Sequence, residues 1–213
     1  MEIEFFGGNA IKIKQGGESI GFDLGSDDGK KSAVAAKDVK GVFFTDDHKA
    51  NVGVPDGVRS FQMPGEYEIG PFSVRGVAVE AQGDVYGTKS SNVFLVDPGD
   101  FGAVGIVAYA KPELSGEALE LLANARLVIV PVGGSGLSLE PEDALKLVKE
   151  LNAEFVIPVH FDDGRTKYEV PQALAAEFAK LCGTEPEIVE GKLVTKKLVG
   201  SVDGVKVVVI NPA

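Results

Sequence analysis

The chain is poor in the side chains that most often carry redox and metal chemistry, with one cysteine and two histidines in 213 residues. A single cysteine excludes a disulfide within the chain. The segment that holds Cys182 has the apolar spacing of a helix, at Leu174, Phe178 and Leu181. We therefore expect Cys182 to be a core residue. Two imidazoles bind a metal weakly without help, so any metal site needs further ligands.

Positive charge is also scarce. The chain has 21 Lys and Arg against 32 Asp and Glu, which gives a net charge of −11, and its longest basic runs are the pairs 30–31 and 196–197. Binding to the phosphate backbone of nucleic acid needs a clustered cationic face. We therefore expect no nucleic-acid partner. A small-molecule ligand is compatible with this charge, because local fields can oppose the net charge.

No apolar run approaches the ~18–20 residues that cross a bilayer, so we expect no membrane partner. The first residues do not show a basic segment followed by an apolar one, and we expect a cytoplasmic protein. The composition, 44% hydrophobic and 25% charged, is that of an ordinary globular protein. Because no repeat or low-complexity linker divides the sequence, we predict a single domain over residues 1–213.

Hydrophobic patterning predicts strands first and an alternation of strands and helices afterwards. The predicted strands cover residues 3–6, 10–14, 19–23, 39–45, 58–62, 67–69, 72–79, 92–96, 104–109, 127–131, 154–158 and 204–210. Helices are predicted after a cap at Ser115, at 140–151 and at 171–182. This order favours sheets packed on each other with helices outside. Site residues are then expected on loops at one edge.

Both histidines stand at the end of apolar runs that predict buried strands. His48 follows V-F-F-T-D-D, and His160 follows V-I-P-V. Strand ends carry binding sites in α/β folds, and histidine is the commonest metal ligand. The two positions therefore mark a candidate site.

The sequence around these histidines resembles the metallo-β-lactamase superfamily, in its branch of small zinc-dependent hydrolases. The most specific stretch is P-V-G-G at 131–134, followed by the predicted helix at 140–151 and by I-P-V-H-F at 157–161. In the family, the last of these stretches reads I-P-M-H-Y, and its histidine is a metal ligand. The order of elements is similar over nearly the whole chain. The resemblance implies the α/β (α+β) class and a four-layer αββα sandwich of the metallo-β-lactamase type.

The chief metal motif of the family, T-H-x-H-x-D-H, falls on T-D-D-H-K-A-N at residues 45–51. His48 matches the second histidine, whereas Asp46 stands for the first one. Ala50 replaces the aspartate and Asn51 the last histidine. An alanine side chain cannot bind a metal, and asparagine offers only a neutral carbonyl, which is poor for zinc.

Other ligand positions of the family also differ. Gly8 replaces an early histidine, Gln82 or Glu80 stands near the histidine after the middle strand, and Tyr109 replaces the aspartate that bridges two metals. We expect Tyr109 to fill the space of a metal. Asp23 does match an aspartate at the end of the third strand.

Of the roughly seven ligands in the family's dinuclear site, the candidates left are Asp46, His48 and His160. The resemblance therefore implies an eroded metal site and a binding or assembly protein without a cofactor, not a dinuclear hydrolase. The alternative is a diverged hydrolase of a phosphoester, lactone or amide. In it, one zinc, manganese or iron ion on these three residues would activate water. By analogy with the family, a homo-oligomer is compatible with either function.

Further motifs have simple structural interpretations. Asp162-Asp163-Gly164 is interpreted as a solvated turn, with orientation of the His160 imidazole as a second hypothesis. Glu66 is expected to be exposed, which favours a structural role over that of a general base. No G-x-S-x-G motif occurs. The glycines at 133–136 lack the Gly-Lys-Ser/Thr of a nucleotide-binding loop.

Overall fold

The computed structural model describes residues 1–25, 34–46, 54–83, 90–198 and 204–213. Its strands are β1 (Glu2–Phe5), β2 (Ile11–Gln15), β3 (Glu18–Phe22), β4 (Gly41–Phe43), β5 (Arg59–Phe61), β6 (Gly65–Ile69), β7 (Phe72–Glu80), β8 (Ser90–Asp97), β9 (Ala103–Ile106), β10 (Ala125–Pro131), β11 (Phe155–Val159), β12 (Glu187–Glu190), β13 (Lys192–Val194) and β14 (Lys206–Asn211). They form a six-stranded sheet in the order β13-β1-β2-β3-β4-β5 and an eight-stranded sheet in the order β12-β14-β11-β10-β9-β8-β7-β6.

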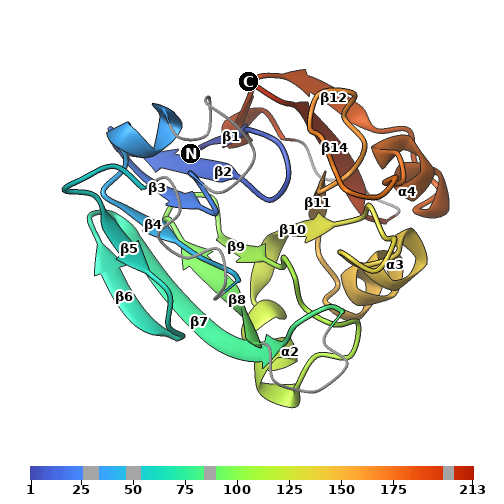
Figure 1. Ribbon diagram of the computed structural model, residues 1–213, viewed down its shortest axis with the longest axis horizontal. Coiled ribbons are helices and arrows are strands. Elements are labelled where there is room, and N and C mark those ends of the chain that lie inside the picture. Colours follow the sequence, from blue (N-terminus) through green and yellow to red (C-terminus); the bar gives the residue numbers. More distant parts are fainter. Residues whose placement is uncertain (26–33, 47–53, 84–89, 199–203) are drawn as a thin grey trace.

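The helices cover the outer face of the eight-stranded sheet. Helix α2 (Gly116–Leu122) packs on β7 and β8, α3 (Pro141–Glu150) on β10, and α4 (Ala175–Leu181) on β11. In Figure 1, α3 and α4 lie on the side of β10 and β11 that is away from β1 and β2. Two short 3-10 helices complete the described elements, η1 (Ala36–Asp38) and η2 (Thr195–Lys197). This arrangement confirms the predicted sandwich class.

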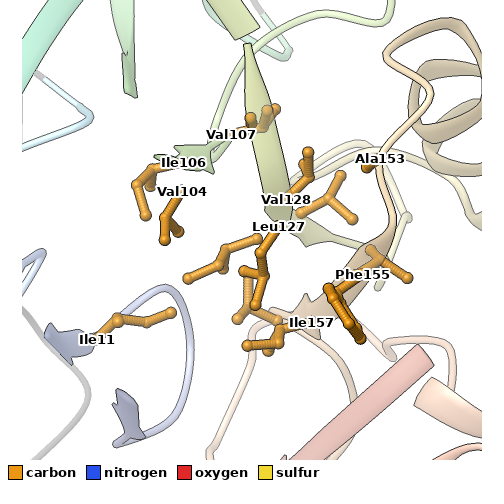
Figure 2. Packing of buried hydrophobic residues seen from close by; sticks show 14 of the residues in the cluster. Ile11, Val104, Ile106, Val107, Leu127, Val128, Ala153, Phe155 and Ile157 are labelled. Atoms are coloured by element: carbon orange, nitrogen blue, oxygen red, sulfur yellow. The ribbon is translucent and has the colours of Figure 1, made fainter. Parts of the chain in front are cut away.

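The core lies between the two sheets and follows from the strand sequences. In β1, Ile3 and Phe5 are fully buried and alternate with partly exposed glutamates, as expected for a strand with one wet face. Strand β11 is apolar throughout, and β10 is apolar apart from the exposed Arg126, because sheet and helix cover both faces of these strands. Figure 2 shows how side chains of the eight-stranded sheet gather opposite Ile11 of the six-stranded sheet; they include Val104, Ile106, Leu127, Phe155 and Ile157. Among the described helices, none is long and apolar enough to cross a membrane.

The C-terminal third differs from the predictions at the start of helix α4 and in two additional strands, β12 and β13. Residues 171–173 are not helical, because the Ala173 N–H donates to the Gly133 carbonyl (2.9 Å) and the Ala173 carbonyl accepts from Asp162 (3.0 Å). Helix α4 therefore begins only at Ala175. Of the three residues with the predicted apolar spacing, Phe178 is buried, whereas Leu174 and Leu181 are 48% and 41% exposed.

Cys182 directly follows helix α4 and is half-buried at the margin of the core, not within it as expected. Strands β12 and β13 were not predicted, because they are short, contain glutamate or lysine, and are half exposed. Between them, Gly191 adopts a φ of +67°, and there the chain leaves one sheet for the other.

Strand direction brings loops from both sheets to one edge of the sandwich. In the six-stranded sheet, β1, β3 and β4 run in the same direction, since β2 is antiparallel to β1 and β3. In the eight-stranded sheet, β7, β9, β10 and β11 do likewise. The carbonyl of Gly8, just after β1, accepts from the His160 N–H, just after β11 (2.8 Å). We call this place, where the C-terminal ends of these strands meet, the strand-end edge.

Candidate functional site

His160 is the centre of the strand-end edge and is only 4% exposed. It is the first residue after β11 and has a φ of +50°. This left-handed backbone costs roughly 1–2 kcal/mol in a residue with a Cβ. The Nδ1 atom lies 3.1 Å from Oε1 of Gln172. The rings of Tyr109 and Tyr168 lie with their centroids 5.7 and 4.8 Å from that of the imidazole.

A buried pair, Asp23 and Thr45, ties the end of β3 to the end of β4. The Asp23 carboxylate accepts from the Thr45 backbone N–H (2.9 Å) and from its hydroxyl (2.6 Å). The Thr45 carbonyl accepts from the Ser91 hydroxyl (2.7 Å) and from the Asn92 N–H (2.8 Å). These bonds fix the backbone that leads into the predicted metal motif, and Asp46 continues it with a β-bridge to Ser91.

The structure describes two of the three predicted metal ligands. Asp46 and His160 both follow strands that end at the strand-end edge, whereas His48, with Ala50 and Asn51, lies outside the described residues. Within the described part of the chain, no three or more His, Cys, Asp or Glu side chains form a group that could hold a metal ion. A site on Asp46, His48 and His160 therefore stays a prediction.

The donor chemistry of the described residues does not fit the family's dinuclear site. Gly8 offers no side chain where the resemblance places a histidine, and Gly8 instead bonds His160 through its carbonyl. Tyr109 stands where the bridging aspartate is expected, and its ring meets the His160 ring edge-on, with 82° between the planes. The phenol ring therefore lies beside the imidazole, and its role in filling the space of a metal stays a prediction.

The acidic turn after His160 is held by its own carboxylates. Asp163 accepts from the N–H groups of Arg165 and Thr166 and from the Thr166 hydroxyl, each at 2.7 Å. Asp162 accepts from the Gly164 N–H at 3.0 Å. These bonds support the interpretation as a turn. Glu66, for which the sequence favours a structural role over that of a general base, is exposed in β6 as expected.

Gln172 is a site residue that could not be identified from the sequence. Its side chain contacts the His160 imidazole although it is 12 residues away in the chain. No motif marks it, because its position depends on the path of the loop between β11 and α4. Only the neighbouring P-V-G-G stretch, whose Gly133 packs against it, is visible in the sequence.

Asn9 adds a second polar group to this edge. It lies in the turn between β1 and β2, which is closed by a bond from the Ala10 N–H to the Gly7 carbonyl (2.9 Å). Asn9 is 4% exposed, and neither its amide nitrogen nor its amide oxygen has a hydrogen-bond partner within the described residues. Leaving buried polar groups unpaired costs about 1–3 kcal/mol each. Native proteins usually satisfy such groups with ordered water or a ligand.

Comparison with known proteins adds to this geometry. A family model described as a β-lactamase superfamily domain matches residues 2–160. Among curated proteins, none matches the chain.

Several solved structures have a similar fold. A candidate Zn-dependent hydrolase of the metallo-β-lactamase superfamily from Thermotoga maritima is 21% identical, with a TM-score of 0.71 over 100% of this chain and 99% of that one. An isothiocyanate hydrolase from Delia radicum gut bacteria is 10% identical, with a TM-score of 0.66 over 97% and 96%. The short form of human tRNase Z is 12% identical, with a TM-score of 0.55 over 76% and 92%. At such identities the likeness concerns the fold alone.

Proposed function

The chain belongs to the β-lactamase superfamily, and we propose that it is a binding protein of this fold with an eroded metal site, not a dinuclear hydrolase. The observation that carries the proposal is the donor chemistry at the strand-end edge. Gly8 and Tyr109 occupy two places where the family has metal ligands, and the sequence has Ala50 and Asn51 at two more. Two metals with a bridging hydroxide need carboxylate and imidazole ligands that these residues do not supply.

The polar groups that are present suit a small polar molecule. Asn9 offers a buried amide donor and a buried amide acceptor, and His160 offers an imidazole that contacts two aromatic rings. Asn9 directly follows Gly8, whose carbonyl accepts from the His160 N–H, so both residues belong to loops that meet at the strand-end edge. Ligand sites typically combine a few polar groups with apolar and aromatic side chains. This part of the proposal is about binding and needs no bond to be broken.

Hydrolysis with a single ion is the competing function. Asp46 and His160 end strands at the same edge, and the similar solved structures include named hydrolases. Catalytic zinc sites have three protein ligands. Asp46 and His160 supply only two, so this function depends on His48 as the third ligand, and we therefore place it second.

A thermal melt with zinc separates the two functions. A ligand that binds the folded state at a thousand times its Kd stabilises it by about 4 kcal/mol. For a chain of this size that corresponds to a rise in Tm of roughly 8–16 °C. We expect the chelator-treated protein to show no rise in Tm with zinc, manganese or ferrous iron. A rise in the wild type that is absent from His160→Ala would contradict the proposal and favour the single-ion hydrolase.

A further inference from the structure

We propose that Gln172 is a positioning residue that holds the His160 imidazole in its Nδ1–H form, so that Nε2 carries the lone pair of the neutral ring. The assignment of the tautomer stands on geometry alone. Its consequence for ligands rests on the proposed function.

The first step is the orientation of the Gln172 amide. Its Nε2 donates to the backbone carbonyls of Val170 (3.0 Å) and Pro171 (3.3 Å). Carbonyl oxygens only accept hydrogen bonds, so the amide nitrogen has to face them. A flipped amide would place its oxygen against two other oxygens and would lose both bonds. The Oε1 atom is therefore the one that faces His160.

The second step is the proton on the imidazole. Oε1 of Gln172 is an acceptor without a hydrogen, and it lies 3.1 Å from Nδ1 of His160. A hydrogen bond at this distance requires Nδ1 to be the donor. In a neutral imidazole only one nitrogen carries a proton, so Nε2 then carries the lone pair.

The third step is the packing that keeps Gln172 in place. The flanking Ala173 is bonded through its N–H to Gly133 and through its carbonyl to Asp162. A Cβ on Gly133 would overlap with Oε1 of Gln172 and with the His160 carbonyl oxygen. Such contacts are impossible without movement, so glycine at 133 lets this backbone approach both residues. The P-V-G-G stretch thus supports the pair of His160 and Gln172.

The fixed tautomer restricts what can face the ring. An Nε2 lone pair accepts hydrogen bonds, and a neutral Nδ1–H imidazole offers no second donor. Any group that bonds Nε2 in this tautomer is therefore an N–H or O–H donor, such as an amide, amine or hydroxyl, rather than a carboxylate.

Nitrogen NMR of protein labelled with ¹⁵N-histidine tests the assignment directly, because the chain has only two histidines. Comparison with His48→Gln identifies the signals of His160. In the chelator-treated protein, at a pH at which the ring is neutral, we expect a protonated Nδ1 and an unprotonated Nε2. A ring protonated mainly at Nε2 would overturn the proposal, even if every variant below failed to fold.

Variants test the role of Gln172 itself. Gln172→Leu removes the acceptor, so the Nδ1–H population is expected to fall. Gln15→Leu serves as the matched control, because Gln15 is a half-exposed glutamine bonded to Asp100. An unchanged Nδ1–H population in folded Gln172→Leu would also refute the proposal. Since these spectra are recorded without metal, their outcome is separate from the zinc melt that tests the proposed function.

Discussion

At the scale of single residues, two buried asparagines differ in their hydrogen bonding. Asn92 is 2% exposed and donates to the Gln62 carbonyl at 3.0 Å, whereas the Asn9 amide has no partner among the described residues. We expect Asn92→Leu to lower the free energy of unfolding by about 1–3 kcal/mol, because it removes the donor to the Gln62 and Phe44 carbonyls. Asn9→Leu is expected to leave it unchanged or to raise it.

Urea unfolding followed by circular dichroism measures both variants. Equal losses for Asn9→Leu and Asn92→Leu would mean that Asn9 is already satisfied in the free protein. That result would remove the main support for a polar ligand at the strand-end edge.

Cys182 gives a prediction about pH. Burial raises the pKa of its thiol from the ordinary 9.0 to about 11, although Lys149 lowers it slightly. The thiolate is the reactive form, so alkylation at pH 8 is expected to be at least about tenfold slower than that of a free thiol. Unfolding in urea should abolish this difference.

The same shift links stability to pH. A raised pKa in the folded state means that Cys182 contributes stability below pH 9, and that this contribution is lost as the pH rises from 9 to about 11. Cys182→Ser should flatten the fall in Tm over that window. Rapid alkylation of the folded protein at pH 8 would show that the thiol is not held in the apolar margin of α4.

At the scale of elements, the bond between Asp23 and Thr45 joins the ends of β3 and β4. Asp23→Ala removes the acceptor of two buried donors, so the free energy of unfolding should fall by about 2–4 kcal/mol. Thr45→Val removes only the hydroxyl bond and should cost less. Urea unfolding measures both, with Asp56→Ala in an exposed turn as the control. A cost for Asp23→Ala no larger than that of Asp56→Ala would refute this role.

The elements that the sequence predicted well are those with a regular burial pattern. The strand pattern of β1–β3 and the apolar face of α3 depend on local periodicity, which is visible in one sequence. Strands β12 and β13 depend on partners far away in the chain, so their short polar sequences gave no pattern. The start of α4 was predicted too early, because the bond from Ala173 to Gly133 is a tertiary contact.

The site divides in the same way. His160 could be located from the sequence because it ends an apolar strand and lies in a motif with the spacing of the family. Gln172 and Asn9 could not, because their roles come from contacts between loops that are distant in the chain. His48 lies outside the described residues, so its role stays a prediction.

At the scale of the whole molecule, a hydrophobic core and buried hydrogen bonds hold the strands whose ends form the strand-end edge. A continuous core between the two sheets and beneath the helices joins residues from nearly every strand. The ends of β3 and β4 are tied by Asp23 and Thr45. Such a scaffold can keep its strand-end edge while the side chains there change, because positions at strand ends are supported by the strands and not by the ligand.

The metal content of the purified protein tests this account most directly. The protein is expressed in medium supplemented with zinc, manganese and iron, purified without chelator or histidine tag, and measured by elemental mass spectrometry beside His160→Ala. We predict well below one equivalent of any of these metals per chain, with no difference between the two proteins. One or two equivalents in the wild type, retained through gel filtration and lost in His160→Ala, would contradict the account.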